Sequence, residues 1–308
     1  MTAATATTQR TARVIWNPNA GQKRLFGPDI EGAAYLRELL GRRGLAAEVV
    51  ETASAEDAER AVRAAVEEGC ALVVAAGGDG TIGEVGRCLL GTDVALGMLP
   101  LGSVMNVPRM LGLPRDLEAA ADALAAGRTE LIDVGEARGD TFFETASVGM
   151  NAAMFREIAR LEEGDYASLP RALWVALRYR PARIQVKLDD ETIHTRALMV
   201  TVSNGPYMGV AMTVAPGARL DDGRFDVRVF RHFSKFELIR HLGSIAFGRR
   251  RYSPHVSSYR SRGVRIESPR PLPCRADSRD LGSTPLECVV RPKALRVVVG
   301  PDYPDLSG

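Results

Sequence analysis

Three glycines, an aspartate and a threonine follow an apolar run, in the order Gly77-Gly78-Asp79-Gly80-Thr81. Glycine within a helix or strand costs about 0.5–1 kcal/mol relative to alanine, so this run indicates either unusual backbone angles or a close approach to the main chain. Bare backbone N–H groups at the start of a helix can bind an oxyanion, because the helix dipole favours negative charge there. The run matches neither the Gly-Lys-Ser/Thr of a P-loop nor Gly-x-Gly-x-x-Gly. It predicts a phosphate-binding turn, and a tight strand-to-helix turn without a ligand is the alternative.

Two further turns of similar composition follow other apolar runs. The first is "NPNAG", from Asn17 to Gly21, and the second is "LPLGSVMN", from Leu99 to Asn106. Ligands of open parallel sheets bind outside the carboxyl ends of the strands, where such turns would gather. We therefore expect the three turns to form one site.

The elements that must position these turns alternate in the first 130 residues. Short apolar runs such as "ARVIW", "AEVV", "ALVVAAG" and "VALGMLP" are separated by helical patterns. This alternation is typical of a parallel sheet covered by helices. From about Thr129 the pattern changes to closely spaced short strands, which indicate an antiparallel sandwich. The predicted fold class is an α/β Rossmann-like N-terminal domain, residues 12–132, followed by an antiparallel β-sandwich domain, residues 133–300.

Composition excludes several classes of function. The 308 residues contain 40 basic and 38 acidic side chains, so no overall positive field favours nucleic acid. Four cysteines lie far apart in the sequence, which argues against a disulfide framework or a Cys-based metal site and suits a cytoplasmic protein. No apolar run approaches the roughly 20 residues of a membrane span, and the first 12 residues do not resemble a signal peptide. We expect a soluble protein.

Motifs along nearly the whole chain then become recognisable. They are Asn17-Pro18-x-Ala20-Gly21, Gly77 to Thr81, Leu99-Pro100-Leu101-Gly102-Ser103, Ser147-x-Gly149, "NGPYMG" at 204–209, "APGARLDDGRFDV" at 215–227, and Asp277. With these motifs the sequence resembles the diacylglycerol-kinase-like lipid kinases, a family that shares its Gly-Gly-Asp-Gly-Thr turn with NAD kinases. The resemblance implies a two-domain kinase that binds ATP in a cleft between a Rossmann-like domain and a β-sandwich, and the last strand residues can return to the first domain.

The resemblance also implies roles for individual residues. Asn17 and Gly21 would contact the nucleotide, and Gly102 and Ser103 would lie beside it. The phosphates would be held by the second turn, at Gly77, Gly78, Gly80 and Thr81.

Three aspartates carry the implied chemistry. Asp79 would act through Mg²⁺ or directly on the reacting hydroxyl, Asp277 would be the general base, and Asp222 would hold a structural Mg²⁺. Phosphoryl transfer depends on charge neutralisation, alignment and a proton acceptor, and carboxylates suit both the ion and the proton.

Several positions depart from the family pattern. Arg279 stands where the family has the glutamate of Asp-Gly-Glu, and we expect it either to pair with Asp277 or to contact a phosphate. Met105 replaces an asparagine, and Arg219 lies where a serine often assists the structural Mg²⁺. Glu144 and Asn151 replace the usual Asn and Asp near Ser147. The alternatives to a lipid kinase are a catalytically silent nucleotide-binding module and an NAD-kinase-like enzyme.

Two segments bear on lipid contact. The arginine-rich stretch from Arg249 to Arg265 is most simply a solvated face, and contact with anionic headgroups is the alternative. Leu173, Trp174 and Leu177 are most simply core, and an apolar groove is the alternative. Together the sequence predicts a cytoplasmic, peripherally membrane-associated kinase that uses ATP and Mg²⁺ to phosphorylate a lipid hydroxyl, that of diacylglycerol or a related amphiphile. A homodimer is compatible with this interpretation.

Overall fold

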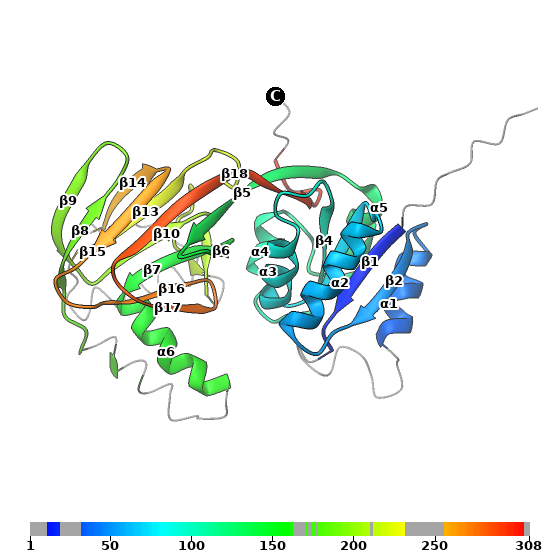
Figure 1. Cartoon of the computed structure of the whole chain (residues 1–308), viewed down its shortest axis with the longest axis horizontal. Helices are drawn as coiled ribbons and strands as arrows, with labels where there is room; N and C mark the ends of the chain where they lie inside the picture. The colour runs from blue at the N-terminus through cyan, green and yellow to red at the C-terminus, as the bar shows by residue number, and fades with distance from the viewer. Residues whose placement is uncertain are drawn as a thin grey trace, which may run out of the picture. The chain divides into compact units, whose positions relative to one another are not determined.

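The computed structural model describes residues 11–18, 32–162, 171, 174–175, 178–209, 212–231 and 256–304. The chain forms two compact units (Figure 1). The first unit comprises Met1–Ile132 together with Ala294–Gly308, and the second comprises Asp133–Lys293. Residues 294–300, which lie within the bounds predicted for the second domain, belong to the first unit, in keeping with the return of the last strand residues that the resemblance implies.

The first unit is built on a parallel sheet, as the alternating pattern predicts. Its strands are β1 (Thr11–Trp16), β2 (Ala46–Glu51), β3 (Leu72–Gly77) and β4 (Ala95–Pro100), in the spatial order β2-β1-β3-β4. The end of β18 (Leu286–Val298) lies parallel to β4, with Val297 opposite Leu96. Strands β3 and β4 are buried along their whole length, because helices cover both faces of the sheet.

Helices cover the sheet in pairs. Helices α1 (Gly32–Gly41) and α5 (Leu117–Ala126) pack together on one face, and α2 (Ala55–Glu67) and α3 (Asp79–Cys88) pack together on the other. Helix α2 begins after Ser54, whose side chain accepts a hydrogen bond from the Asp57 amide, 3.2 Å, and so caps the helix. A short helix, α4 (Asn106–Met110), follows β4.

The second unit is a β-sandwich. One sheet has the order β14-β13-β10-β7-β16-β17, formed by Val256–Ser261, Phe225–Phe230, Met199–Ser203, Thr145–Gly149, Pro273–Ala276 and Arg279–Ser283. The other contains β18, β15 (Gly263–Glu267), β8 (Ala182–Lys187) and β9 (Thr192–Ala197), with β5 (Thr129–Ala137) and β6 (Asp140–Phe142) paired beside β18. Strands β11 (Tyr207–Met208) and β12 (Met212–Thr213) form a separate small ribbon.

Apolar side chains from both sheets form the core of the sandwich. The Phe142 and Phe225 rings, one from each sheet, stack with their centroids 5.5 Å apart. The predicted fold class is confirmed for both units: a parallel α/β unit and an antiparallel sandwich.

Two local features of the second unit position residues discussed below. The turn at 188–191 closes the β8–β9 hairpin, with the Leu188 amide donating to the Glu191 carbonyl, 2.8 Å. Helix α6 (Met150–Glu162) is attached to β17 by Arg156, which donates to both carboxylate oxygens of Asp280 at 2.6 and 2.8 Å.

The segments considered for lipid contact are only partly described. Trp174 is 58% exposed, and the Arg178 guanidinium lies 4.8 Å from its ring centroid, so the prediction that Trp174 is core is wrong. Leu173, Leu177 and Arg249 to Arg251 lie outside the described residues. Within the described ranges, no helix has the length and apolar character needed to cross a membrane.

Candidate functional site

The carboxyl edge of the parallel sheet brings the predicted turns of the first unit together. In the parallel register Trp16 lies opposite Ala76, and Gly77 lies opposite Pro100. Asn17 follows β1 directly, so it lies at the same edge as the turns after β3 and β4. The Leu101 amide donates to the Gly77 carbonyl, 3.0 Å, which joins two of these turns. Gly21 lies outside the described residues.

The turns after β3 and β4 touch through their backbones. A Cβ on Gly102 would come within 2.6 Å of the Gly78 Cα and 2.7 Å of the Met105 Sδ. Only glycine therefore fits at position 102, because real Cβ atoms do not approach backbone atoms so closely.

Gly78 itself is a different case. Its backbone is extended (φ −89°, ψ −177°), a conformation that any residue adopts, and a Cβ there would meet nothing closer than the Gly102 Cα at 3.7 Å. A Cβ on Gly80 would meet no atom within 4 Å. The fold of this unit thus does not require glycine at 78 or 80, which is the pattern expected where a ligand approaches the main chain.

Among the described residues, no side chain caps the start of helix α3. Gly78 is its N-cap, and the Ile82 amide donates to the Gly78 carbonyl, 3.0 Å. The first-turn amides of a helix have no partner within the helix and attract anions. The buried Thr81 lies in the same turn. This edge can bind an oxyanion through main-chain N–H groups.

Asp79 fixes the turn after β4 in place. Its Oδ2 accepts a hydrogen bond from the Asn106 amide, 3.2 Å, and its Oδ1 accepts one from the Val107 amide, 3.1 Å. Both amides belong to the first turn of α4, so the carboxylate caps that helix. The sequence did not indicate this function, because the donors lie 27 and 28 residues away along the chain.

Ser103 is exposed in the same turn. Its carbonyl accepts a hydrogen bond from the Arg115 guanidinium, which holds the loop against the segment that precedes α5. Its side chain remains accessible for contact with a bound molecule.

In the second unit, Asp277 binds a run of three backbone amides. Its Oδ2 accepts from Phe143, 2.8 Å, and its Oδ1 accepts from Glu144 and Thr145, both 3.0 Å. Asp277 has a positive φ of 46°, in the left-handed region that aspartate tolerates better than most residues. No sequence pattern indicated these donors, because they lie 132 to 134 positions earlier in the chain.

Burial raises the pKa of the Asp277 carboxyl, and the three amide hydrogen bonds act in the opposite direction. The neighbouring Arg275 stabilises the same turn, because its Nε donates to the Asp277 carbonyl at 2.8 Å. The Arg275 guanidinium also stacks on the Phe155 ring of α6, 3.6 Å from the ring centroid. Asp277 is therefore held by the segment that leads into β7, by its own turn and, through Arg275, by helix α6.

Arg279, the main departure from the Asp-Gly-Glu pattern, has a partner on another strand. Its Nη1 donates to Asp140 Oδ1 on β6, 2.7 Å. This ion pair was not among the partners expected from the sequence, which were Asp277 and a phosphate.

Asp222 lies in a loop whose carboxylates are engaged by arginines. Asp222 Oδ2 accepts from Arg260, and its Oδ1 accepts from the Arg224 amide, 3.0 Å. Asp221 accepts two hydrogen bonds from Arg219, at 2.9 and 2.7 Å. Among the described residues, no group of three His, Cys, Asp or Glu side chains is arranged to hold a metal ion. These residues do not fit the structural Mg²⁺ site that the resemblance implies for Asp222.

Buried polar side chains surround the start of β7 and the end of β10. The Asn151 Nδ2 donates to Ser147 Oγ, 3.0 Å, and the Asn204 Nδ2 donates to the carbonyls of Asp133 and Phe143, at 3.0 and 3.2 Å. The Asn204 bonds fix the same segment, 143–145, whose amides bind Asp277. The second unit thus positions Asp277 through a network of buried hydrogen bonds.

Comparison with known proteins agrees with both units. Residues 11–137 match the model of the diacylglycerol kinase catalytic domain, and residues 145–299 match the YegS C-terminal NAD kinase beta sandwich-like domain. The chain is 26% identical over 294 residues to a diacylglycerol kinase of Bacillus subtilis, covering 94% of this chain and 96% of that protein. It is 28% identical over 293 residues to a diacylglycerol kinase of Mycobacterium tuberculosis, covering 92% and 93%.

A solved structure shares the fold. The crystal structure of a diacylglycerol kinase from Bacillus anthracis superposes with a TM-score of 0.74 at 19% identity, covering 96% of this chain and 98% of that one. The two family matches together span the α/β unit and the β-sandwich, and the second alone covers half of the chain. The chain therefore belongs to the diacylglycerol kinase-like family of lipid kinases, with a catalytic-type domain followed by a YegS-type β-sandwich.

Proposed function

We propose that this protein is an ATP- and Mg²⁺-dependent lipid kinase that transfers the γ-phosphoryl group to a lipid hydroxyl, with diacylglycerol or a related amphiphile as substrate. The observation that carries the proposal is the pair of glycines at 78 and 80. Neither the backbone angles at 78 nor the packing at either position excludes a side chain. A ligand that contacts the main chain gives a reason for both glycines, and the names of the relatives indicate its class.

The nucleotide phosphates would lie on the first-turn amides of α3. These N–H groups and the helix dipole neutralise negative charge without any reorganisation during the reaction. The Thr81 hydroxyl lies within that turn, and Asn17 and Ser103 lie on the flanking turns where they can contact the rest of the nucleotide.

When bound with the nucleotide, Mg²⁺ would supply positive charge that offsets the charge developing on the phosphate oxygens. Asp79 is the carboxylate of the first unit placed to hold such an ion, because it lies in the first turn of α3. Each of its oxygens accepts one amide and keeps a second lone pair.

We assign proton transfer to Asp277. In the reaction the lipid hydroxyl oxygen forms a bond to the γ-phosphorus of ATP, and the bond from that phosphorus to the oxygen of the β-phosphate breaks, so that ADP leaves. The O–H bond of the lipid also breaks, and its proton passes to a carboxylate oxygen. The Asp277 Oδ2 accepts only one amide hydrogen bond among the described residues and can accept this proton. The raised pKa of Asp277 favours this function, since a general base works best when its pKa approaches the working pH.

The experiment is transfer of γ-labelled phosphate from ATP to a panel of lipid alcohols in mixed micelles. We expect a labelled phospholipid product from diacylglycerol or a close relative. The same assay with NAD⁺ separates the NAD-kinase-like alternative, which would give labelled NADP⁺. ATP binding without transfer to any acceptor would reject the lipid kinase proposal in favour of a silent nucleotide-binding module.

A further inference from the structure

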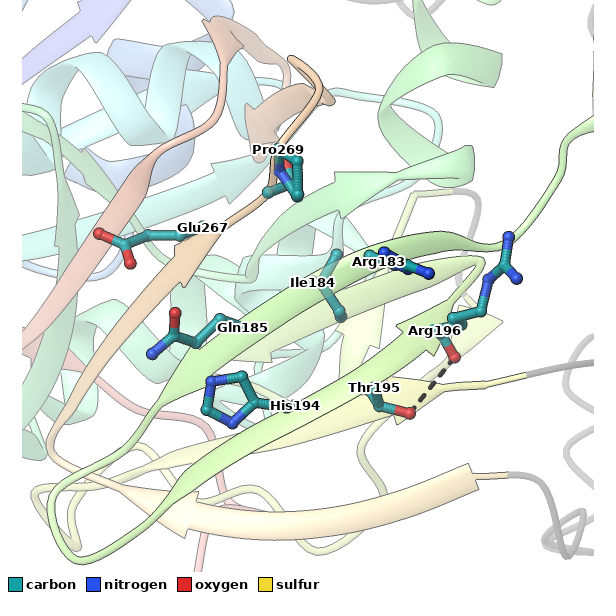
Figure 2. A pocket seen from close by; sticks show the side chains of 9 residues that line it. Arg183, Ile184, Gln185, His194, Thr195, Arg196, Glu267 and Pro269 are labelled. Carbon is teal, nitrogen blue, oxygen red and sulfur yellow. Dashed lines mark hydrogen bonds between the residues drawn. The ribbon is translucent and has the colours of Figure 1, made fainter.

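A pocket of about 520 Å³ lies on the β8–β9 hairpin and the neighbouring end of β15, in the second unit. Figure 2 shows its side chains. Arg183 and Arg196 reach toward one end, and Gln185 and His194 lie toward the other. None of these residues belongs to the candidate site described above.

The two arginines form a cross-strand pair. Arg183 on β8 lies directly opposite Arg196 on β9, and both are exposed. Directly opposed residues of an antiparallel pair have Cβ atoms about 4.5–5.5 Å apart on the same face, where two like charges repel each other. An anion between the two guanidinium groups would remove this repulsion.

Glu267, a carboxylate that lines the same pocket, does not neutralise the two arginines. Glu267 on β15 lies opposite Gln185, and it pairs instead with Arg265, 2.8 Å, and with Lys187, 3.3 Å. Within the described part of the chain, neither Arg183 nor Arg196 has a carboxylate partner. The pocket therefore carries two positive charges at one end.

Protection of an exposed sheet edge does not account for this pair. Basic side chains on an edge strand discourage pairing with other sheets, and Arg196 on the edge strand β9 would serve that purpose. Arg183 lies on β8, whose pairing with β15 ends at Gln185, so at Arg183 this strand is paired with β9 alone. Protection of an edge does not require two arginines directly opposite each other, where like charges repel, whereas an anion bound by both gives a reason for the pair.

We propose that this pocket binds a phosphate-type oxyanion between Arg183 and Arg196. Two planar guanidinium groups offer several N–H donors in the geometry that suits phosphate oxygens. The Gln185 amide and the His194 imidazole provide further polar contacts along the pocket. The phosphate is carried either by a phospholipid headgroup or by a soluble phosphate ester. Binding of this anion does not depend on kinase activity.

The soluble source is tested by thermal unfolding with inorganic phosphate and with glycerol 3-phosphate at constant ionic strength. We expect either ligand to raise the melting temperature of the wild type more than that of Arg183→Ala or Arg196→Ala, because these variants keep only the oxyanion site at the start of α3. Without ligand, each variant should be at least as stable as the wild type, because a like-charge repulsion is removed. This second result also shows that the variants fold.

The headgroup source is tested by flotation with phosphatidylglycerol and phosphatidylcholine vesicles. Each arginine near an anionic surface is expected to contribute about fivefold to affinity, so Arg183→Ala/Arg196→Ala should lose on the order of 25-fold on phosphatidylglycerol. Arg60→Ala/Arg63→Ala, which removes two exposed arginines of α2 in the other unit, is the charge-matched control and should lose much less. Dependence on the two arginines in either experiment supports the pocket and identifies the source. Equal behaviour of wild type and double variant with soluble phosphate and with both vesicle types would overturn it.

Discussion

Gly78 and Gly102 lie so close that a Cβ on Gly102 would come within 2.6 Å of the Gly78 Cα. The contact joins the turns after two adjacent parallel strands, and it is asymmetric. A Cβ on Gly78 would stay 3.7 Å from the Gly102 Cα, an ordinary van der Waals distance. Position 102 is therefore glycine because of the fold, whereas the fold gives no reason for glycine at 78.

Gly102→Ala should destabilise the first unit by about 1–3 kcal/mol, because the new methyl group cannot be accommodated without moving backbone. Gly83→Ala is the matched control. Position 83 is within α3, and a Cβ added there would meet no atom within 4 Å, so alanine should stabilise the helix by about 0.5–1 kcal/mol. Urea unfolding followed by circular dichroism measures both. Equal stability of the two variants would contradict the close contact.

Asp79→Asn should lower the stability of the first unit by about 1–2 kcal/mol. The amide side chain retains one acceptor oxygen, and its NH₂ group would face the other backbone N–H of α4. Asp93→Asn, at an exposed loop position of the same unit, should be nearly neutral. If Asp79→Asn were as stable as Asp93→Asn, the cap on α4 would not contribute as described.

Asp277→Asn should reduce both phosphoryl transfer and the stability of the second unit. Stability should fall by about 2–3 kcal/mol, because three amides lose a charged acceptor. Asp280→Asn breaks an exposed ion pair with Arg156 and leaves the exposed Gly282 amide a neutral acceptor in place of a charged one, so it should cost at most about 1 kcal/mol.

The pH dependence of transfer separates the two effects of Asp277. Its pKa is raised, so a general base at this position becomes protonated, and kcat/KM falls, at a higher pH than for an ordinary aspartate. Any residual activity of Asp277→Asn should lack this acidic limb. An unchanged limb in the variant would assign Asp277 a purely structural function.

Chelation should not destabilise the loop that contains Asp222. Its carboxylate is paired with Arg260, which also lies 3.7 Å from Asp226, so guanidinium supplies the positive charge. EDTA should leave the wild-type melting temperature unchanged, and Arg260→Ala should cost about 1–2 kcal/mol by leaving these carboxylates unpaired. A fall of several degrees in EDTA, reversed by Mg²⁺, would show that a metal ion is bound there after all.

Asp133 should make the stability of the second unit depend more strongly on pH. Burial raises its pKa, and the amides of Gly223 and Lys293 oppose that shift. Because the folded protein then binds the proton more tightly than the unfolded chain, this residue's contribution is fully present below the unfolded pKa and is lost as pH rises through the folded pKa. Relative to Asp133→Asn, the wild type should therefore gain stability on acidification toward pH 4. Parallel pH profiles of unfolding free energy for the two proteins would contradict this.

The fold was predictable because its signals are local. Buried strands followed by helical patterns indicate the parallel unit, and the turn at Asp189 and Asp190 indicates a hairpin that the structure contains. The glycine turns could be placed at one sheet edge for the same reason, since parallel strands carry their carboxyl ends to one side.

The partners of the three aspartates were not predictable from the sequence. Each depends on strand register or on loops far apart in the chain. Asp222 pairs with Arg260, which is brought to the acidic loop because β14 places it opposite Asp226 of β13, in an antiparallel register that no local pattern specifies. The sequence therefore assigned Arg260 to a solvated or lipid-facing stretch, whereas it neutralises an acidic loop. The contacts of Asp277 with the amides at 143–145 have the same origin.

Gly78 and Gly80 are expected to leave space for the phosphates of a nucleotide on the amides of α3, and the proposed kinase activity depends on this. Calorimetric titration of ATP·Mg²⁺ into the wild type, Gly78→Ala, Gly80→Ala and the control Gly83→Ala tests it most directly. We predict that all four proteins fold, that wild type and Gly83→Ala bind ATP, and that the variants at 78 and 80 lose at least about tenfold in affinity. Wild-type affinity in folded Gly78→Ala and Gly80→Ala would contradict a phosphate site at these glycines.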